Sequence, residues 1–104
     1  MSLNFGERKY CNKVESITAS DLASTLFTRA TPLYIGVSGD VRVIMSSVTD
    51  SDAVSGTALA SGSATLFKNG VQGSCLGGDI PIMIKAVFDT NTTATNLLKL
   101  LEDR

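Results

Sequence analysis

The clearest structural signal in the chain is the stretch LYIGV-SGD-VRVIM, which occupies residues 33–45. Two runs rich in β-branched and aromatic residues flank a short glycine-containing segment at residues 38–40, and this arrangement predicts a β-hairpin. In the second run Arg42 alternates with apolar neighbours, as expected for a strand with one face on the core. We therefore expect the core face of this strand to consist of Val41, Val43 and Met45.

Two more strands are predicted on the C-terminal side of this stretch. The sequence SATLFK at residues 63–68 predicts a strand that ends at the turn pair Asn69-Gly70. The sequence IPIMIKAVFD at residues 80–89 is the longest apolar run and predicts the central core strand. The closing LLKLLEDR, residues 97–104, suits either a short helix or a final strand, and the pattern leaves both open.

The remaining segments have less regular patterns. Residues 16–30 predict a loop with a short strand or turn, and residues 46–62 predict a long polar loop. Residues 1–14 mix polar, aromatic and charged types without a period, which indicates an N-terminal arm. Together these segments predict an all-β fold, a small single-domain β-sandwich or barrel at residues 15–104 preceded by the arm.

The composition argues against several classes of function. The 104 residues include 9 Lys and Arg, 10 Asp and Glu, and neither His nor Trp, which gives a formal net charge of -1. Nucleic-acid binders usually carry a basic excess, so we expect no nucleic-acid partner. Residues 1–20 lack the charged-then-apolar pattern of a signal peptide, and no run approaches the ~20 apolar residues of a membrane helix. We expect a soluble protein made in a cytoplasm.

No group of residues in the sequence supports catalysis or a cofactor. The chain has no His, which is the commonest general base and zinc ligand. A nucleophile, a base and an orienting group cannot be assembled from the remaining side chains. Asp50 and Asp52 match only part of a calcium-loop pattern. Cys11 and Cys75 lack metal-ligand spacing and are interpreted as two free thiols, with a disulfide as the alternative. We therefore predict no enzymatic activity, no metal and no cofactor.

A succession of short motifs runs through residues 17–98. In order, these motifs are Thr28-Arg29-Ala30, Leu33-Tyr34-Ile35-Gly36, Gly39-Asp40-Val41, Leu66-Phe67, Ile80-Pro81-Ile82, Lys85-Ala86-Val87 and Thr92-Thr93-Ala94-Thr95. The succession resembles the spike base protein family of gene transfer agents and tailed phages. The resemblance implies a small β-rich virion protein, made in the host cytoplasm, that forms a ring-like homo-oligomer and serves as a platform for a fibre or spike.

Two classes of function agree with these observations. The first is a structural virion protein that forms a homo-oligomeric spike or fibre base at a capsid vertex, in contact with itself, with capsid or tail proteins and with a fibre or spike protein. A capsid cement or decoration protein, or a tail or baseplate adaptor, is the alternative within this class. The second is a carbohydrate- or ligand-binding β-module, which requires exposed aromatic side chains. The charged fraction of only 18% favours the first class, because charge is depleted at the centres of interfaces.

Three regions are expected to make the subunit contacts. They are the arm at residues 1–14, the loop at residues 46–62 and the glycine-rich turn at residues 70–79. The turn matches no phosphate-binding pattern, and we expect its glycines to allow tight turning and close approach of a neighbour. The candidate interface residues are Phe5, Arg8, Tyr10, Arg29, Tyr34, Arg42, Gly73, Gly77 and Gly78.

Overall fold

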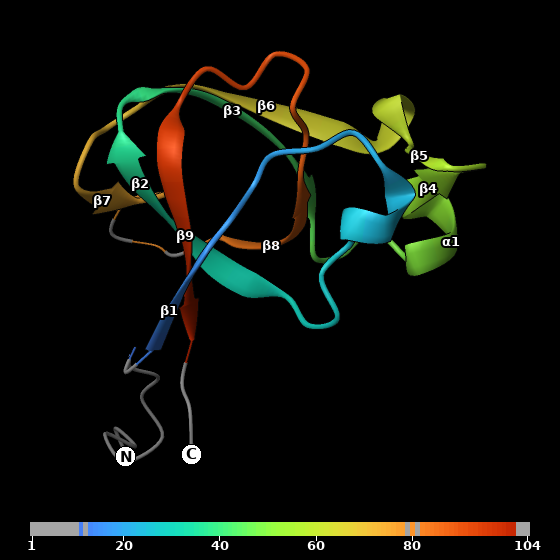
Figure 1. The fold of residues 1–104 in the computed structure, drawn as a ribbon, viewed down its shortest axis with the longest axis horizontal. Helices are drawn as coiled ribbons and strands as arrows, with labels where there is room; N and C mark the ends of the chain where they lie inside the picture. The colour runs from blue at the N-terminus through green and yellow to red at the C-terminus, as the bar shows by residue number, and fades with distance from the viewer. Residues whose placement is uncertain (1–10, 12, 79, 81, 102–104) are drawn as a thin grey trace.

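A computed structural model describes residues 11, 13–78, 80 and 82–101. Within this part of the chain, seven strands form one antiparallel sheet in the order β1-β9-β2-β8-β3-β6, with β7 pairing with β2 beside this path (Figure 1). The strands are β1 (Lys13–Ser16), β2 (Thr31–Val37), β3 (Gly39–Met45), β6 (Ala64–Gly70), β7 (Ser74–Cys75), β8 (Met83–Val87) and β9 (Thr95–Leu101). The predicted all-β fold is confirmed.

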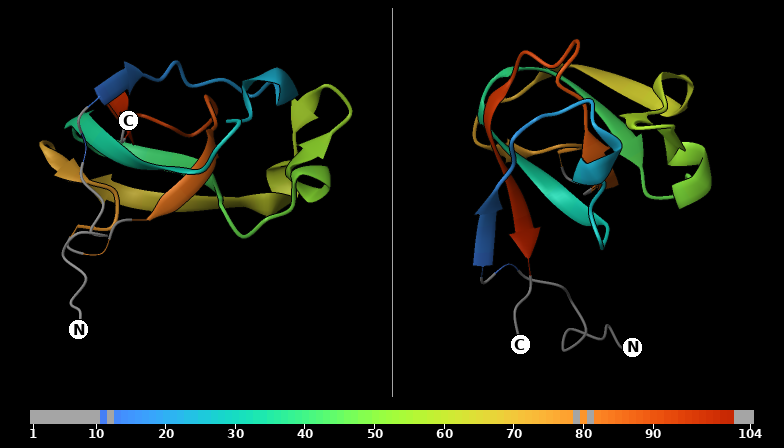
Figure 2. Two further views of the ribbon diagram at one scale, coloured as in Figure 1. Left: turned by 90° about the horizontal axis from the view of Figure 1, so that it is seen from below. Right: turned by 45° about the vertical axis from the view of Figure 1, so that its right-hand side comes forward.

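The sheet bends so that its two ends form opposing layers around one core. Figure 2 shows β1 and β2 in one layer and β3 and β6 in the other, with β8 crossing between the layers. The main core contains the buried side chains of Leu33, Ile35, Leu76, Val41, Val43, Ile84, Val87, Ala94 and Leu97. Val41 and Val43 therefore face the core as predicted, and Met45 packs against it while half-buried.

The predicted hairpin at residues 33–45 is wrong in its pairing, although both of its strands form. β2 pairs with β9, β8 and β7, whereas β3 pairs with β8 and β6, and these described strands share no register with each other. β8 lies between them and pairs with β2 along one edge and with β3 along the other, and its side chains are buried on both of its faces. Ile84 and Val87 enter the main core, and Ala86 enters a second cluster. Local sequence specifies the strands here but not their partners.

The beginning of β3 is held by the turn that follows β8. The backbone N–H of Asp40 donates to Thr93 Oγ1 at 2.8 Å, and the N–H of Arg42 donates to Thr92 Oγ1 at 3.0 Å. In return, the Asp40 carbonyl accepts from the N–H groups of Thr93 and Ala94. The threonines of this turn thus bond to the β3 backbone beyond the point where β8 ends.

Residues 46–62 are a folded excursion, so the prediction of a long polar loop is wrong for this segment. It contains the one-turn helix α1 (Asp50–Ala53), the small hairpin of β4 (Val54–Ser55) and β5 (Ala58–Leu59), and the start of the 3-10 turn η3 (Ser61–Ser63). Ala53 and Leu59 are buried with Ile44, Ala86 and Phe88 in a second apolar cluster. Two buried side chains and the half-buried Val48 anchor this polar stretch, a signal too sparse to give a period.

Four further segments can be compared with their predictions: the apolar run, the C-terminal run, the loop before β2 and the N-terminal arm. The central strand of the apolar run begins only at Met83. Residues 97–101 of the C-terminal run belong to strand β9, the second of the two open alternatives. Of residues 16–30, Ser16 ends β1, and residues 17–30 are a loop with a 3-10 turn, η2 (Ala23–Thr25), and the single bridge residue Leu22. Lys13 and Val14, the last residues of the predicted arm, form the first half of β1. Residues 1–10 and 12 of the arm lie outside the described residues.

Candidate interaction surfaces

An apolar stripe crosses the outer face of β1, β9 and β2. Residues paired in an antiparallel sheet lie on the same face, and side chains alternate between faces along each strand. Because Leu33, Ile35 and Leu97 face the core, their neighbours along β2 and β9 face outward. We call this set the outer stripe: Val14, Leu98, Leu100, Tyr34, Cys75, Pro32 and Met83. None of these side chains is charged, and none is fully buried.

Exposure along the outer stripe is greatest at its two ends. Val14 on β1 is 52% exposed and Met83 at the start of β8 is 41% exposed, whereas the side chains between them are half-buried. Covering apolar side chains that are exposed to water at the rim of a sheet lowers the free energy, so such side chains favour binding of a partner. The outer stripe is therefore a surface suited to contact with another protein.

The outer edge of β1 has no strand partner among the described residues. In an antiparallel pair the backbone groups of alternate residues point toward the partner and away from it. The N–H of Ile17 donates to the carbonyl of Leu97 at 2.9 Å, so Glu15 and Lys13 also direct their backbone groups toward β9. The N–H and C=O groups of Val14 and Ser16 consequently point to the open edge. Such an edge is a ready template for pairing with another strand.

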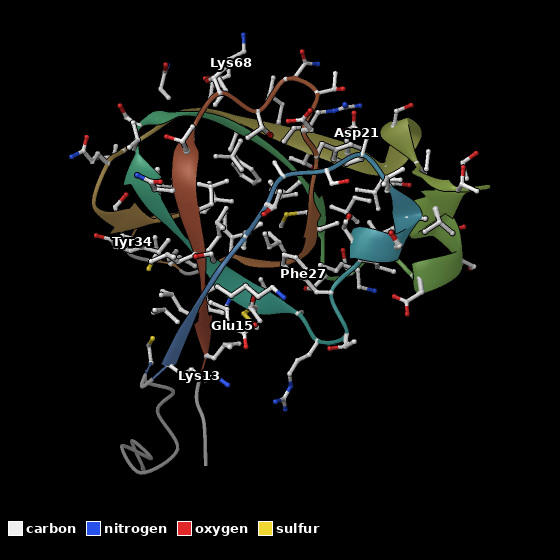
Figure 3. The ribbon with its side chains drawn as sticks, viewed as in Figure 1. Lys13, Glu15, Asp21, Phe27, Tyr34 and Lys68 are labelled. Carbon is white, nitrogen blue, oxygen red and sulfur yellow. The ribbon has the colours of Figure 1, made fainter. Side chains whose placement is uncertain are left out.

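Charged residues lie on the other face of β1, beside Phe27. Figure 3 shows Lys13, Glu15 and Phe27 along the front of this strand. Glu15 is 3.7 Å from the Nζ of Lys13 and 4.0 Å from the Nζ of Lys99, and Lys99 Nζ lies 4.2 Å from the centroid of the Phe27 ring. β1 therefore presents an apolar outer face and a charged inner face on either side of its open edge.

The glycine-rich turn lies against Tyr34 of the outer stripe. Tyr34 pairs with Cys75 of β7, and a Cβ at Gly73 would lie 3.8 Å from the Tyr34 hydroxyl. Gly73, Gly77 and Gly78 all have positive φ, of 80°, 94° and 65°, which side chains other than glycine rarely adopt. Local turn geometry thus accounts for the three glycines, and the turn sits where a partner on the outer stripe would reach it.

Asp21, labelled in Figure 3, is the centre of a polar cluster that joins three segments of the chain. Asp21 Oδ1 accepts the N–H groups of Asp89 at 2.9 Å and Thr90 at 3.1 Å, and Oδ2 accepts the Thr90 hydroxyl. The hydrogen bonds from the hydroxyl and then the N–H of Thr90 hold the pKa of the Asp21 carboxyl below its ordinary value of 3.8, and Arg42 adds a smaller lowering. Arg42 in turn lies over the Phe88 ring, with its Cζ 4.3 Å from the centroid. The Asp21 carboxylate and the Arg42 guanidinium both have partners within the domain, which indicates a structural cluster.

The described residues contain no group of three His, Cys, Asp or Glu side chains able to hold a metal ion. Asp50, weighed above as part of a calcium loop, accepts a hydrogen bond from Lys85 Nζ at 2.7 Å. Cys11 is exposed, Cys75 is half-buried, and both are free thiols. None of the helices described here is long and apolar enough to cross a membrane.

The sequence-derived interface residues are distributed over separate places. Tyr34, Gly73, Gly77 and Gly78 lie together at the glycine-rich turn, Arg42 lies in the Asp21 cluster, and Arg29 is exposed in the loop before β2. Phe5, Arg8 and Tyr10 lie outside the described residues. Their roles in an interface stay predictions.

Sequence reasoning included Val14 only as the last residue of the arm and missed Leu98 and Leu100, which together form the β1–β9 part of the outer stripe. The signal for them was the alternation of Leu98 and Leu100 with Lys99 in the C-terminal run, once that run is assigned to a strand.

Comparisons of the chain with protein-family models, with curated proteins and with solved structures find no match.

Proposed function

We propose that this protein is a structural virion component of a tailed phage or gene transfer agent, which assembles with copies of itself into the base of a spike or fibre. Its partners in this proposal are further copies of the chain, capsid or tail proteins, and the spike or fibre protein that the base carries. The work of such a protein is protein–protein contact, performed in the particle after synthesis in the host cytoplasm.

The outer stripe is the observation that carries this proposal. A domain of 104 residues leaves uncharged apolar side chains at the rim of its sheet, next to an open strand edge. Burying such a rim against a neighbour stabilises both partners, and small domains gain most because a single core of this size has little stability in reserve. Assembly also covers a strand edge that would otherwise favour aggregation.

The aromatic side chains support contact with protein rather than with sugar. Among the described residues, Phe88 is buried, and Phe27, Tyr34 and Phe67 are half-buried. Arg42 covers the Phe88 ring and Lys99 covers the Phe27 ring. A sugar-binding module needs open aromatic faces for stacking, and the rings of Phe88 and Phe27 already have cationic partners.

The residues that carry the family resemblance occupy positions in the scaffold. Leu33 and Ile35 of the motif on β2 lie in the main core. Thr92 and Thr93 of the closing motif bond to the backbone of β3. The resemblance therefore supports a scaffold shared with that family, and the proposed role in the particle is the role that the resemblance implies.

The proposal is tested by measuring the mass of the purified full chain by light scattering at two concentrations about tenfold apart, with electron microscopy of the same samples. We expect an oligomer that forms symmetric, closed particles. A second sample lacking residues 1–10, which retains β1, locates the contact: assembly that survives this deletion places it on the sheet, and assembly that is lost places it on the arm. A monomer at both concentrations, or an open-ended aggregate, would contradict the proposal.

A further inference from the structure

The open edge of β1 carries a charge pattern that is complementary to itself. Lys13 and Glu15 flank Val14, and all three side chains are exposed. The alternation derived above directs the N–H and C=O of Val14 away from β9, toward the open edge. An edge of this kind can accept a second strand that runs antiparallel to it.

We propose that β1 pairs antiparallel with β1 of a second copy of the chain, about a two-fold axis at Val14. This inference rests on the self-association proposed above and specifies the surface that makes it. In this register the Val14 residues of the two copies exchange two backbone hydrogen bonds, as the hydrogen-bonded pair of an antiparallel ladder. Lys13 of each copy lies opposite Glu15 of the other, so the contact contains two cross-strand pairs of opposite charge.

The two faces of the paired strands also match. The charged side chains of Lys13 and Glu15 lie on the inner face, where Lys99 is already within 4.0 Å of Glu15. The Val14 side chains of the two copies meet on the outer face, beside Leu100 of β9. The outer stripe of one copy therefore continues into that of the other, and the most exposed apolar side chain of β1 becomes covered.

The open edge at the opposite end of the sheet, on β6, lacks this complementarity. β6 pairs only with β3 among the described residues, and its single charged side chain is Lys68, which is exposed. Pairing β6 with a second β6 brings together two positive charges and no negative ones. A lysine on an edge strand is a common means of preventing such pairing. The charge pattern therefore selects β1 as the edge on which a second copy docks.

A two-fold contact of this type uses the same surface on both copies and is closed. It joins chains in pairs, so an assembly in which every chain makes this contact contains an even number of chains. A ring requires a second, different surface in addition. Because β1 has only four residues, the contact is short, and we expect a concentration-dependent pair rather than an obligate dimer.

Charge reversal with mixing tests this inference. The variants are Lys13→Glu and Glu15→Lys in the full chain, with Lys68→Glu on the β6 edge as a matched control. Each single β1 variant places like charges opposite each other, and we expect its dissociation constant to rise by about tenfold. An equimolar mixture of the two β1 variants regains opposite charges and should regain association as a mixed pair. The control should associate like the unmodified chain.

Sedimentation equilibrium measures the association of each sample, and circular dichroism establishes that each variant is folded. If the unmodified chain associates and the folded β1 variants associate equally well, β1 is not the contact, although self-association stands. If the variants lose association and the mixture does not regain it, the proposed pairing of Lys13 with Glu15 across two copies is overturned. If the unmodified chain stays monomeric at every concentration, both this inference and the proposed self-association fail.

Discussion

Asp21 joins segments that lie far apart in the sequence. Its carboxylate accepts hydrogen bonds from Asp89 and Thr90, and its carbonyl accepts from the N–H of Leu59 at 2.8 Å. One residue thus connects the loop before η2, the folded excursion and the turn after β8. Nothing in the local sequence indicates this role, because all of these hydrogen-bond partners are at least 38 positions away along the chain.

The lowered pKa of Asp21 predicts a pH-dependent stability. Its folded-state pKa is below the ordinary value of 3.8, so its contribution is complete above about pH 4 and is lost as the pH falls through the folded-state pKa. Asp21→Asn should reduce stability at neutral pH and flatten the acid-side decline. Urea unfolding at pH 6 and pH 3 measures both effects. Asp52→Asn is the control, since Asp52 is exposed and its side chain accepts no hydrogen bond from the described residues; an equal change in both variants would contradict the role of Asp21.

Gly36 allows β2 and β9 to approach closely. A Cβ at this position would overlap the carbonyl oxygen and the Cβ of Asn96 on β9. We expect Gly36→Ala to lower the free energy of unfolding by about 1–3 kcal/mol, as for other overpacked sites. Gly62→Ala is the matched control, because a Cβ there meets nothing within 4 Å, and its effect should stay within about 1 kcal/mol. Denaturant unfolding of the two variants compares them, and equal stabilities would contradict the close approach.

Secondary structure was predictable where the residues of a strand carry the pattern themselves. β-branched and aromatic runs located β2, β3, β6 and β8, and alternation identified Val41 and Val43 as core residues. The partners of those strands were not predictable, because β8 enters between β2 and β3 from about 40 residues further along the chain. The excursion at residues 46–62 was missed for a related reason. Its buried residues Ala53 and Leu59 pack against Phe88 and Ile44, which lie outside this segment of the sequence and become neighbours only in the folded chain.

The second apolar cluster predicts a large difference between two leucines. Leu59 on β5 is 4% exposed, whereas Leu66 on β6 is 41% exposed. Leu59→Ala should reduce the free energy of unfolding by about 2–5 kcal/mol, the range for buried leucines. Leu66→Ala makes the same chemical change and should cost about 1 kcal/mol or less, because much of that side chain is already in water. Thermal or urea unfolding distinguishes them, and similar losses would show that the excursion is not anchored by Leu59.

At the scale of the whole molecule, the outer stripe extends to β1, the end strand of the sheet, whose outer edge is open among the described residues. The sequence predicted a low-charge surface suited to subunit contact and named Tyr34 and the glycine-rich turn as candidate contact residues. The fold places Tyr34 within the outer stripe and the turn next to it, and their role in an interface stays a prediction. It did not predict the edge of β1, because an edge exists only once the strand order is known. The self-complementary Lys13-Val14-Glu15 pattern has physical meaning only on such an edge.

Amide hydrogen exchange at Val14 tests the central claim, that copies of this chain meet at the edge of β1. NMR-detected exchange at two protein concentrations compares Val14, whose N–H points outward, with Glu15, whose N–H points toward β9. We expect the Val14 amide to exchange quickly in dilute protein and slowly in concentrated protein, while the Glu15 amide stays protected in both. Equally fast exchange of Val14 at both concentrations would contradict the claim.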